Sequence, residues 1–220
     1  MALHRIGRGP RKFENFVSRT YRPLLYLRNT GTVIYVPTRI LMVCTANVCR
    51  SPMAAAILQN LVDASGIDAM VTSAGTHGPN GLGVDPEAVD SVTRWGIDLR
   101  DHEPRLLTKE IGAEEGADMI ITMERMHLRH VVALDRRTWA RAFTLKELNR
   151  RIALAGPMSS NNLTTWISAL GSGRRAADML VDSPHDDIAD PYGKGPAEVT
   201  RTSNELYLLL QTLVSTVPWP

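Results

Sequence analysis

Cysteine is scarce in the 220-residue sequence, which contains only two, Cys44 and Cys49, both within the stretch CTANVCRSP. A zinc site of four cysteines is therefore excluded, and the six histidines offer no obvious pair of ligands for a mixed site. Cytoplasmic thiols stay reduced. In that compartment, two cysteines so close together indicate a reactive or metal-binding role rather than a structural disulfide.

Long apolar runs are missing as well. The longest, RILMVC and LYLLLQTLV, fall far short of the roughly 20 residues that a membrane-spanning helix needs. Near the N-terminus the longest apolar run is LLYL, which is too short for the core of a secretory signal. With 44% hydrophobic and 22% charged residues, the composition is that of a soluble globular protein, and we expect a cytoplasmic one.

Acidic residues are nearly absent from one part of the chain. Residues 1–39 contain eight basic residues and a single acid, Glu14, although the net charge of the whole chain is only +2. We expect residues 1–37 to be a basic N-terminal extension that contacts an acidic partner or is simply solvated. Aromatic residues do not alternate with the basic ones there, which disfavours nucleic acid as a partner. Residues 20–38 allow either a hairpin or an edge strand.

Strand-like and helix-like segments alternate in the rest of the chain. Short apolar runs predict strands at 39–44, 69–75, 117–123 and 140–145. Helical spacing and end signals predict helices at 52–66, 85–96, 124–135 and 196–214, with amphipathic helical material from 146 to 181. This alternation predicts an α/β fold: an open, mainly parallel, twisted four-stranded sheet with helices on both faces. We expect one domain, residues 38–220, with a helical insertion near 146–181.

The stretch CTANVCRSP lies between the first strand and the first helix, where α/β sheets bind their ligands. Pro52 suits the first helical position and Ser51 the cap, so the amides of the preceding turn can face an anion. Arg50 adds a planar fork that matches two oxygens of a tetrahedral oxyanion. We expect Cys44 at the floor of this cradle, where the local field favours a thiolate. The stretch therefore predicts a cysteine nucleophile facing a bound phosphoryl group.

The same stretch resembles the loop of the low-molecular-weight protein tyrosine phosphatases, which reads Cys-x-x-Asn-x-Cys-Arg-Ser-Pro. Further segments resemble this family in the same order along the chain: TSAGT, DPEAV, WGIDLRDHEPRLLT, ADMIITME and the general-acid loop DIADPYGKG. The resemblance implies the α/β fold of that family. It also implies hydrolysis of phosphotyrosine or small aryl phosphates, with no metal and no cofactor.

By this resemblance Cys44 attacks phosphorus, and Arg50 and the loop amides hold the equatorial oxygens. Asp190 protonates the leaving group and then activates water. Ser51 donates a hydrogen bond to the cysteine sulfur, and Cys49 traps oxidised Cys44 as a reversible disulfide. The remaining residues that the resemblance assigns to substrate binding or to the supporting hydrogen-bond network are Thr45, Ala46, Asn47, Val48, Ser73, His102 and Tyr192.

Several positions depart from the family pattern. Ala46 stands where glycine is common, Thr45 where the pocket wall is often apolar, and Tyr192 is single where some members carry an adjacent pair. Two alternatives to the phosphatase remain open: an arsenate reductase on the same fold that uses an external small-molecule thiol, and a non-catalytic phosphotyrosine-binding module. The complete set of nucleophile, arginine and acid favours the phosphatase.

Two other groups of titratable residues invite interpretation as metal sites. His127 and His130 are three positions apart on an expected helix, and we expect both at the surface. Asp182, Asp186 and Asp187 crowd the approach to the general-acid loop, and we expect them to be solvated. Neither group is predicted to bind a metal.

Overall fold

The computed structural model describes residues 37–78, 81, 83–111, 116–155, 163–217 and 219. The predicted basic extension and the hairpin or edge strand over 20–38 therefore lie almost entirely outside the described residues. The four strands of the sheet are β1 (Thr38–Cys44), β2 (Ala69–Gly75), β3 (Met119–Thr122) and β4 (Ala142–Thr144). They are parallel and lie in the order β2-β1-β3-β4, which confirms the predicted fold class.

Helices follow the strands, as the alternation predicts. The helical elements are α1 (Arg50–Ala64), α2 (Pro86–Thr93), α3 (Arg125–Leu134), η3 (Arg136–Ala140), α4 (Leu145–Ala155), α5 (Leu163–Leu170), α6 (Ala176–Leu180), η4 (Pro184–Asp186) and α7 (Pro196–Thr216). The predicted cap of α2 is present, because the Asp85 side chain accepts from the Glu87 amide and Pro86 opens the helix. Among the described residues, no helix combines the length and the apolar character that crossing a bilayer requires.

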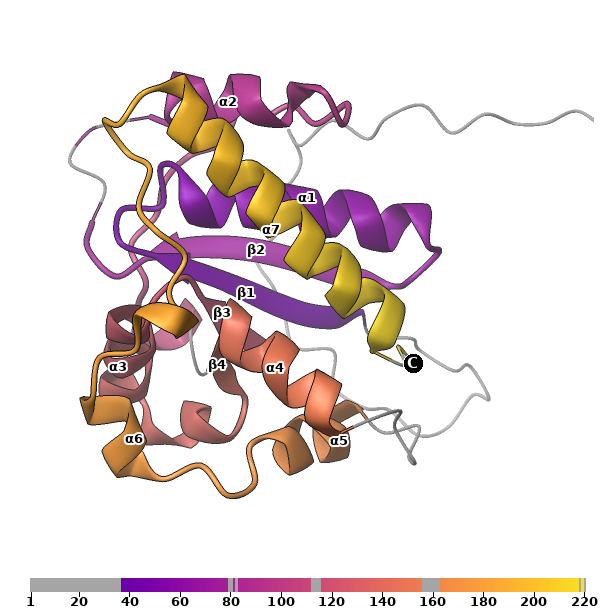
Figure 1. The fold of residues 1–220 in the computed structure, drawn as a ribbon, viewed down its shortest axis with the longest axis vertical. Helices are drawn as coiled ribbons and strands as arrows, with labels where there is room; N and C mark the ends of the chain where they lie inside the picture. Colours follow the sequence, from indigo (N-terminus) through magenta and orange to yellow (C-terminus); the bar gives the residue numbers. More distant parts are fainter. Residues whose placement is uncertain are drawn as a thin grey trace, which may run out of the picture. The chain divides into compact units, whose positions relative to one another are not determined.

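The sheet is buried on both faces, which explains the continuously apolar sequence of β1. Ile40 and Met42 belong to the larger buried cluster, together with residues of α1, α4, α5 and α7. Leu41 and Val43 point the other way, into a second cluster that includes residues of α3. Figure 1 shows α7 running diagonally across α1, β2 and β1, and α7 is in contact with α1.

The helical material predicted for 146–181 packs against the sheet. Its expected apolar face is buried: Leu163, Trp166, Ile167 and Leu170. The turn after α5 is anchored by Arg174, whose guanidinium lies 3.6 Å from the centroid of the Trp139 ring and pairs with Glu147 at 3.0 Å. The segment therefore contributes to the core and to the neighbourhood of the acid loop described below.

The strand order determines where loops from distant parts of the sequence meet. From β1 the chain forms β2 on one side and then returns to form β3 on the other side of β1. In open parallel sheets, ligands bind at such a reversal, beyond the carboxyl ends of the strands. The residues that leave β1 and β3 at this edge begin at Cys44 and Met123, and the backbone amide of Met123 donates to the carbonyl of Val43 at 2.9 Å.

Candidate active site

The phosphate loop, residues 44–50, turns from β1 into α1 and presents the Cys44 sulfur to two hydrogen-bond partners. Ser51 Oγ lies 3.0 Å from Cys44 Sγ, and the Asn47 backbone amide lies 3.3 Å from it. The Asn47 side chain donates to Ser51 Oγ at 2.9 Å, and the serine hydroxyl group faces both the sulfur at 3.0 Å and the Ala74 carbonyl at 3.5 Å. The sulfur is therefore held at the floor of the loop by contacts to Ser51 and to the Asn47 amide.

Asn47 fixes the shape of this loop. Its φ of 60° lies in the left-handed region, which asparagine tolerates better than most residues. Its side-chain amide donates to Ser73 Oγ at 2.8 Å and accepts from the Arg105 backbone amide at 3.0 Å. The backbone carbonyl of Asn47 lies 3.0 Å from His102 Nε2. Burial lowers the pKa of His102, so the neutral ring donates through Nε2. The structure thus brings Ser73 and His102 to the loop, as the family resemblance implies.

Gly75 lets β2 approach the phosphate loop closely. A Cβ at this position would lie 2.7 Å from the Thr45 carbonyl oxygen, 2.8 Å from the Ala46 carbonyl carbon and 2.9 Å from the Asn47 amide nitrogen. All three are backbone atoms, so a side chain here would displace the loop itself. The sequence shows a glycine at the end of this strand, but only the fold explains why one is needed.

Arg50 connects the phosphate loop to the two other segments of the site. Its side chain is only 2% exposed. Nη1 pairs with Glu124 and also donates to the Ile188 carbonyl at 3.0 Å. Nη2 lies 3.0 Å from Asp190 Oδ2, whose side chain is 48% exposed. The expected general acid and the expected phosphate-binding arginine are therefore in direct contact.

Two sequence-based expectations about this region need correction or addition. The predicted cap at Ser51 is wrong: α1 already begins at Arg50, and the Ser51 hydroxyl faces Cys44 and Asn47 instead of capping the helix. Glu124 was not predicted as a site residue. Its position directly after the strand segment ADMIITM was the available signal, since that edge of the sheet is where the site forms.

The acid loop, residues 187–195, is fastened at its start. The Ile188 amide donates to the Met123 carbonyl at 2.7 Å, and Lys146 Nζ donates to the Asp187 carbonyl at 2.8 Å. Immediately before the loop, Asp186 is 1% exposed. Its two carboxylate oxygens each bind one arginine at 2.6 Å, Arg125 from α3 and Arg150 from α4.

The expectation of solvated aspartates is therefore wrong for Asp186. Burial alone would raise the pKa of its carboxyl group, but hydrogen bonds from Arg150 and Arg125 outweigh burial and hold that pKa below its usual value. Asp187 is half-buried and accepts from the Arg125 amide at 2.8 Å. Asp182 behaves as predicted: its side chain is 86% exposed and pairs with Arg129 at the surface.

The expectation of a surface position is wrong for His127 and holds for His130 in part. His127 is 0% exposed, and its Nε2 lies 2.9 Å from Thr45 Oγ1. Burial, followed by the charge of Arg50, lowers the pKa of His127 to about 3. This histidine is neutral at physiological pH and lies against the wall of the phosphate loop. His130 is half-buried beside the ring of His77.

The other expected site residues surround this centre. Cys49 is buried, and burial, followed by the charge of Asp85, raises the pKa of its thiol. Val48 is also buried, and its carbonyl accepts from the Asp85 amide at 2.8 Å. Ala46 is partly buried against the core, whereas Tyr192, on the acid loop, is 51% exposed.

Comparison with known proteins agrees with this geometry. A sequence profile of the family described as low molecular weight phosphotyrosine protein phosphatase matches residues 39–157, more than half of the chain. The chain belongs to this family. The match includes the phosphate loop and Glu124 but ends before the acid loop.

Relatives of the phosphatase carry two different activities in their names. A protein-arginine-phosphatase of Bacillus subtilis (strain 168) is 30% identical over 175 residues, which are 79% of this chain and 93% of that protein. A probable low molecular weight protein-tyrosine-phosphatase of Ralstonia nicotianae, EpsP, is 33% identical over 143 residues, which are 64% of this chain and 92% of that protein.

Solved structures share the fold of the phosphatase. A low molecular weight protein tyrosine phosphatase from T. tengcongensis has a TM-score of 0.61 and 29% identity, and the match covers 82% of this chain and 99% of that one. A YwlE arginine phosphatase with a phosphorylated active-site serine has a TM-score of 0.60 and 26% identity, with 80% and 93% covered.

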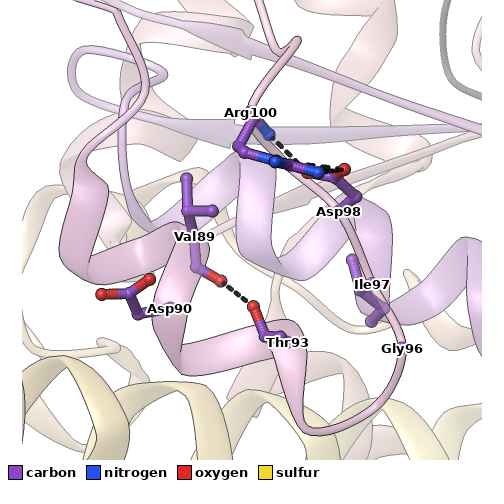
Figure 2. Close-up of a pocket in the computed structure, with 7 residues that line it drawn as sticks. All are labelled: Val89, Asp90, Thr93, Gly96, Ile97, Asp98 and Arg100. Carbon is purple, nitrogen blue, oxygen red and sulfur yellow. Dashed lines mark hydrogen bonds and ion pairs between the residues drawn. The ribbon is translucent and has the colours of Figure 1, made fainter.

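A second concave region lies away from these loops. A hollow of about 440 Å³ lies beside α2 and the turn that follows it. Figure 2 shows the residues that line it, among them Arg100, which binds Asp98. Its other lining residues are Val89, Asp90, Thr93, Gly96 and Ile97. None of them belongs to the phosphate loop or the acid loop. In the described parts of the chain, no three His, Cys, Asp or Glu side chains gather in positions to bind a metal ion.

Proposed function

We propose that this phosphatase hydrolyses phosphotyrosine in proteins, and small aryl phosphates, through a phosphoryl group carried on Cys44. The observation that carries the proposal is the contact at Arg50. One side chain joins the phosphate loop, at 2% exposure, to the Asp190 carboxylate 3.0 Å away, while two donors converge on the Cys44 sulfur. Nucleophile, oxyanion ligand and proton donor are then within reach of one phosphoryl group.

The first step transfers the phosphoryl group to sulfur. The Cys44 thiolate forms the S–P bond as the bond between phosphorus and the tyrosine oxygen breaks. Asp190, in its carboxylic acid form, gives its proton to the departing oxygen. The loop amides and Arg50 stabilise the charge on the three equatorial oxygens throughout. General-acid help of this kind is worth about 10² to 10⁴ in rate.

The second step returns the enzyme to its starting state. Asp190, now a carboxylate, takes a proton from water as the water oxygen attacks phosphorus. The S–P bond breaks, and the electron pair returns to the Cys44 sulfur, where Ser51 and the Asn47 amide again donate to it. Inorganic phosphate leaves. Water supplies the attacking oxygen and the proton that restores the carboxylic acid of Asp190, so the two steps consume one water molecule and leave the enzyme unchanged.

Phosphoarginine is the second candidate substrate. It is favoured by the protein-arginine-phosphatases of Bacillus subtilis and Geobacillus stearothermophilus, which match 79% and 81% of this chain. The Asp190 and Glu124 carboxylates both pair with Arg50, and negative charge at this place would favour a cationic leaving group. Tyr192 offers an exposed ring that can stack on an aryl group or on a guanidinium group.

Phosphate release from matched phosphotyrosine, phosphoarginine and phosphoserine peptides tests the proposal. The assay contains a reducing agent and no added metal, and compares wild type with Cys44→Ser and Asp190→Asn. We expect release from the tyrosine peptide, no turnover by Cys44→Ser, and a loss of about 10² to 10⁴ in kcat for Asp190→Asn. Release from the arginine peptide alone would overturn the substrate assignment.

Arsenate reduction with an external small-molecule thiol is the remaining arm of this assay. Both cysteines of the chain lie in the phosphate loop, so the chain contains no third cysteine to relay an oxidation. A wild-type protein that is inert on all three peptides but consumes thiol in the presence of arsenate would replace the phosphatase proposal. A protein that only binds phosphotyrosine peptide would support the binding-module alternative.

We propose further that the enzyme acts in the cytoplasm and that residues 1–37 form a basic extension outside the domain of residues 38–220. The extension carries seven basic residues and one acid. It would contact an acidic partner through charge attraction, which salt screens. Removing residues 1–37 is expected to leave turnover of a small aryl phosphate unchanged, and loss of that turnover would contradict the assignment.

A further inference from the structure

His127 is a buried histidine that the two reaction steps do not use. It lies in the first turn of α3, is fully buried, and directs Nε2 to Thr45 Oγ1 at 2.9 Å. Its other ring nitrogen, Nδ1, has no hydrogen-bond partner among the described residues. A polar ring is costly to bury when half of it is unpaired, and an apolar side chain would avoid that cost. The single contact to Thr45 therefore calls for a functional explanation.

Thr45 also contacts Arg50, the arginine of the site. Arg50 Nη2 lies 3.3 Å from Thr45 Oγ1, and because a guanidinium group can only donate, the threonine oxygen is the acceptor. Either tautomer of His127 keeps that oxygen between the imidazole and the guanidinium group. The backbone of Thr45 is also held, since its carbonyl accepts from the His77 amide at 2.8 Å. The hydroxyl group is thus fixed from both sides.

The two ends of the guanidinium group differ in what holds them. Nη1 binds Glu124 and the Ile188 carbonyl. Nη2 binds Thr45 at 3.3 Å and Asp190 at 3.0 Å. Asp190 has to turn toward the leaving-group oxygen to act as the acid, and that movement removes one of the two acceptors at Nη2. Thr45 is then the remaining described side chain that orients this end.

We propose that Thr45 and His127 form a positioning pair that holds the Nη2 end of Arg50 toward the phosphoryl group while Asp190 acts as the general acid. The inference rests on the proposed phosphatase mechanism. Neither residue touches the reacting atoms in this role. Thr45 sets the direction of the arginine, and His127 sets the direction of the threonine. The pair also explains why a polar residue stands at a wall position where an apolar one would pack.

Isosteric variants separate this role from simple packing. Thr45→Val keeps the volume and removes the acceptor, whereas Thr45→Ser keeps the oxygen. His127→Leu removes the imidazole, whereas His127→Gln places an amide near the position of Nε2. A double variant, Thr45→Val with His127→Leu, shows whether the two residues act as one unit.

Two measurements are made on each full-length variant: kcat and KM for p-nitrophenyl phosphate, and the affinity for inorganic phosphate by calorimetry. Phosphate binding requires no turnover, so it tests the pair even if the proposed tyrosine substrate proves wrong. A hydrogen bond to a charged group is worth enough for about a tenfold effect. We expect Thr45→Val and His127→Leu each to lose about tenfold in both kcat and phosphate affinity. The conservative variants Thr45→Ser and His127→Gln are expected to stay close to wild type.

The double variant gives the sharpest outcome. If the two residues act on Arg50 as one unit, the double variant loses no more kcat and phosphate affinity than the more impaired of the two single variants. Losses that multiply instead would show independent roles and overturn the pair. Wild-type phosphate affinity in Thr45→Val would also overturn it, and this outcome remains measurable even if His127→Leu fails to fold. Urea unfolding of each variant shows whether an activity loss merely follows lower stability.

Discussion

The phosphate loop and the acid loop meet at Arg50, but different forces hold them. Asn47, Ser51, Ser73 and His102 fix the phosphate loop through hydrogen bonds between uncharged groups. The acid loop instead begins beside Asp186, whose buried carboxylate is bound by two arginines. The phosphate loop is thus held by several hydrogen bonds along its length, whereas the acid loop is held by ion pairs just before its start, and its Asp190 side chain is 48% exposed.

This difference suits the two roles. The phosphate loop has to present its amides and the Cys44 sulfur in one geometry throughout the reaction, because misplacement by about 1 Å is enough to cost about 10²-fold in rate. In the proposed mechanism Asp190 serves two different oxygens in succession, and its side chain is 48% exposed on the acid loop. The anchor at Asp186 fixes where the acid loop starts and leaves the position of its acid adjustable.

The largest expected effect comes from Gly75→Ala, which disturbs the phosphate loop. The added Cβ would lie 2.7 to 2.9 Å from three backbone atoms of the phosphate loop, so the loop must shift. We expect kcat/KM to fall about 10²-fold or more and the free energy of unfolding to fall by about 1–3 kcal/mol. Steady-state kinetics on p-nitrophenyl phosphate and urea unfolding measure the two quantities.

Gly83→Ala is the matched control, because a Cβ at Gly83 would meet nothing within 4 Å. It is expected to behave as wild type in both measurements. If Gly75→Ala kept full activity, the phosphate loop would be more adaptable than its hydrogen bonds indicate, and the contrast with the acid loop would be lost.

A smaller effect is expected from Asp186→Asn, which breaks the anchor of the acid loop. The variant leaves Arg125 and Arg150 without their shared carboxylate. Hydrogen bonds to charged groups contribute about 1.5–3 kcal/mol, and Arg150 is 51% exposed, so we expect a stability loss near the lower end. We expect kcat to fall about tenfold with little change in KM, because the acid is displaced while phosphate binding persists.

Asp182→Asn is the control for this variant. Its carboxylate pairs with Arg129 at the surface and is 86% exposed, and exposed pairs contribute about 0–1 kcal/mol. An equal loss in both variants would mean that general charge near the loop matters and that the buried anchor does not.

The phosphate loop was largely predictable because its parts are contiguous. Nine consecutive residues supply the nucleophile, the arginine and the serine, and their position between a buried strand and a helix fixes which edge of the sheet they occupy. The order of strands and helices was predictable for a similar reason, since it depends on local apolar spacing. Only the precise ends of elements shifted, as at Arg50, where α1 starts two residues earlier than expected.

The anchor of the acid loop was not predictable in this way. Arg125 and Arg150 are separated from Asp186 by 61 and 36 positions, and nothing local in the sequence pairs an arginine on one helix with a distant aspartate. His127 did carry a local signal. It lies one helical turn before Val131 and beside Leu128, on the buried face of α3, so helical periodicity alone would have placed it inside.

The two regions are also expected to lose stability in different pH ranges. Burial lowers the pKa of His102, so below about pH 6.5 the unfolded chain binds a proton more readily than the folded one, and stability falls as the pH falls. The pKa of Asp186 is held low, so its contribution is present above about pH 3.9 and is lost as the pH falls through its lower folded value. The phosphate loop weakens first and the anchor later.

Urea unfolding of wild type, His102→Gln and Asp186→Asn at several pH values measures this. Between pH 7 and 5 we expect His102→Gln to lose less stability than the other two, by at most about 1.4 kcal/mol per pH unit. Below pH 4, Asp186→Asn is expected to show the shallower decline. His127 titrates with the same sign in all three proteins and cancels in the differences. If the free energy of unfolding depended on pH in the same way for all three proteins, the two regions would not differ in their response to pH.

The smallest effect on turnover is expected at Cys49, whose proposed role concerns the phosphate loop after oxidation. Peroxide converts the Cys44 thiolate to a sulfenic acid, and the Cys49 thiol would then displace water to form a disulfide that a dithiol reopens. Burial raises the pKa of the Cys49 thiol, so Cys49 stays protonated while Cys44 is reduced, and its proton leaves with the displaced water when the disulfide forms. Cys49→Ala should therefore keep kcat/KM within about threefold under reducing conditions.

After peroxide treatment, wild type should regain activity with dithiothreitol, whereas Cys49→Ala should not, because its Cys44 proceeds to the irreversible sulfinic acid. Equal recovery of both proteins would show that Cys49 only packs beneath the phosphate loop, and that the loop relies on its hydrogen bonds alone.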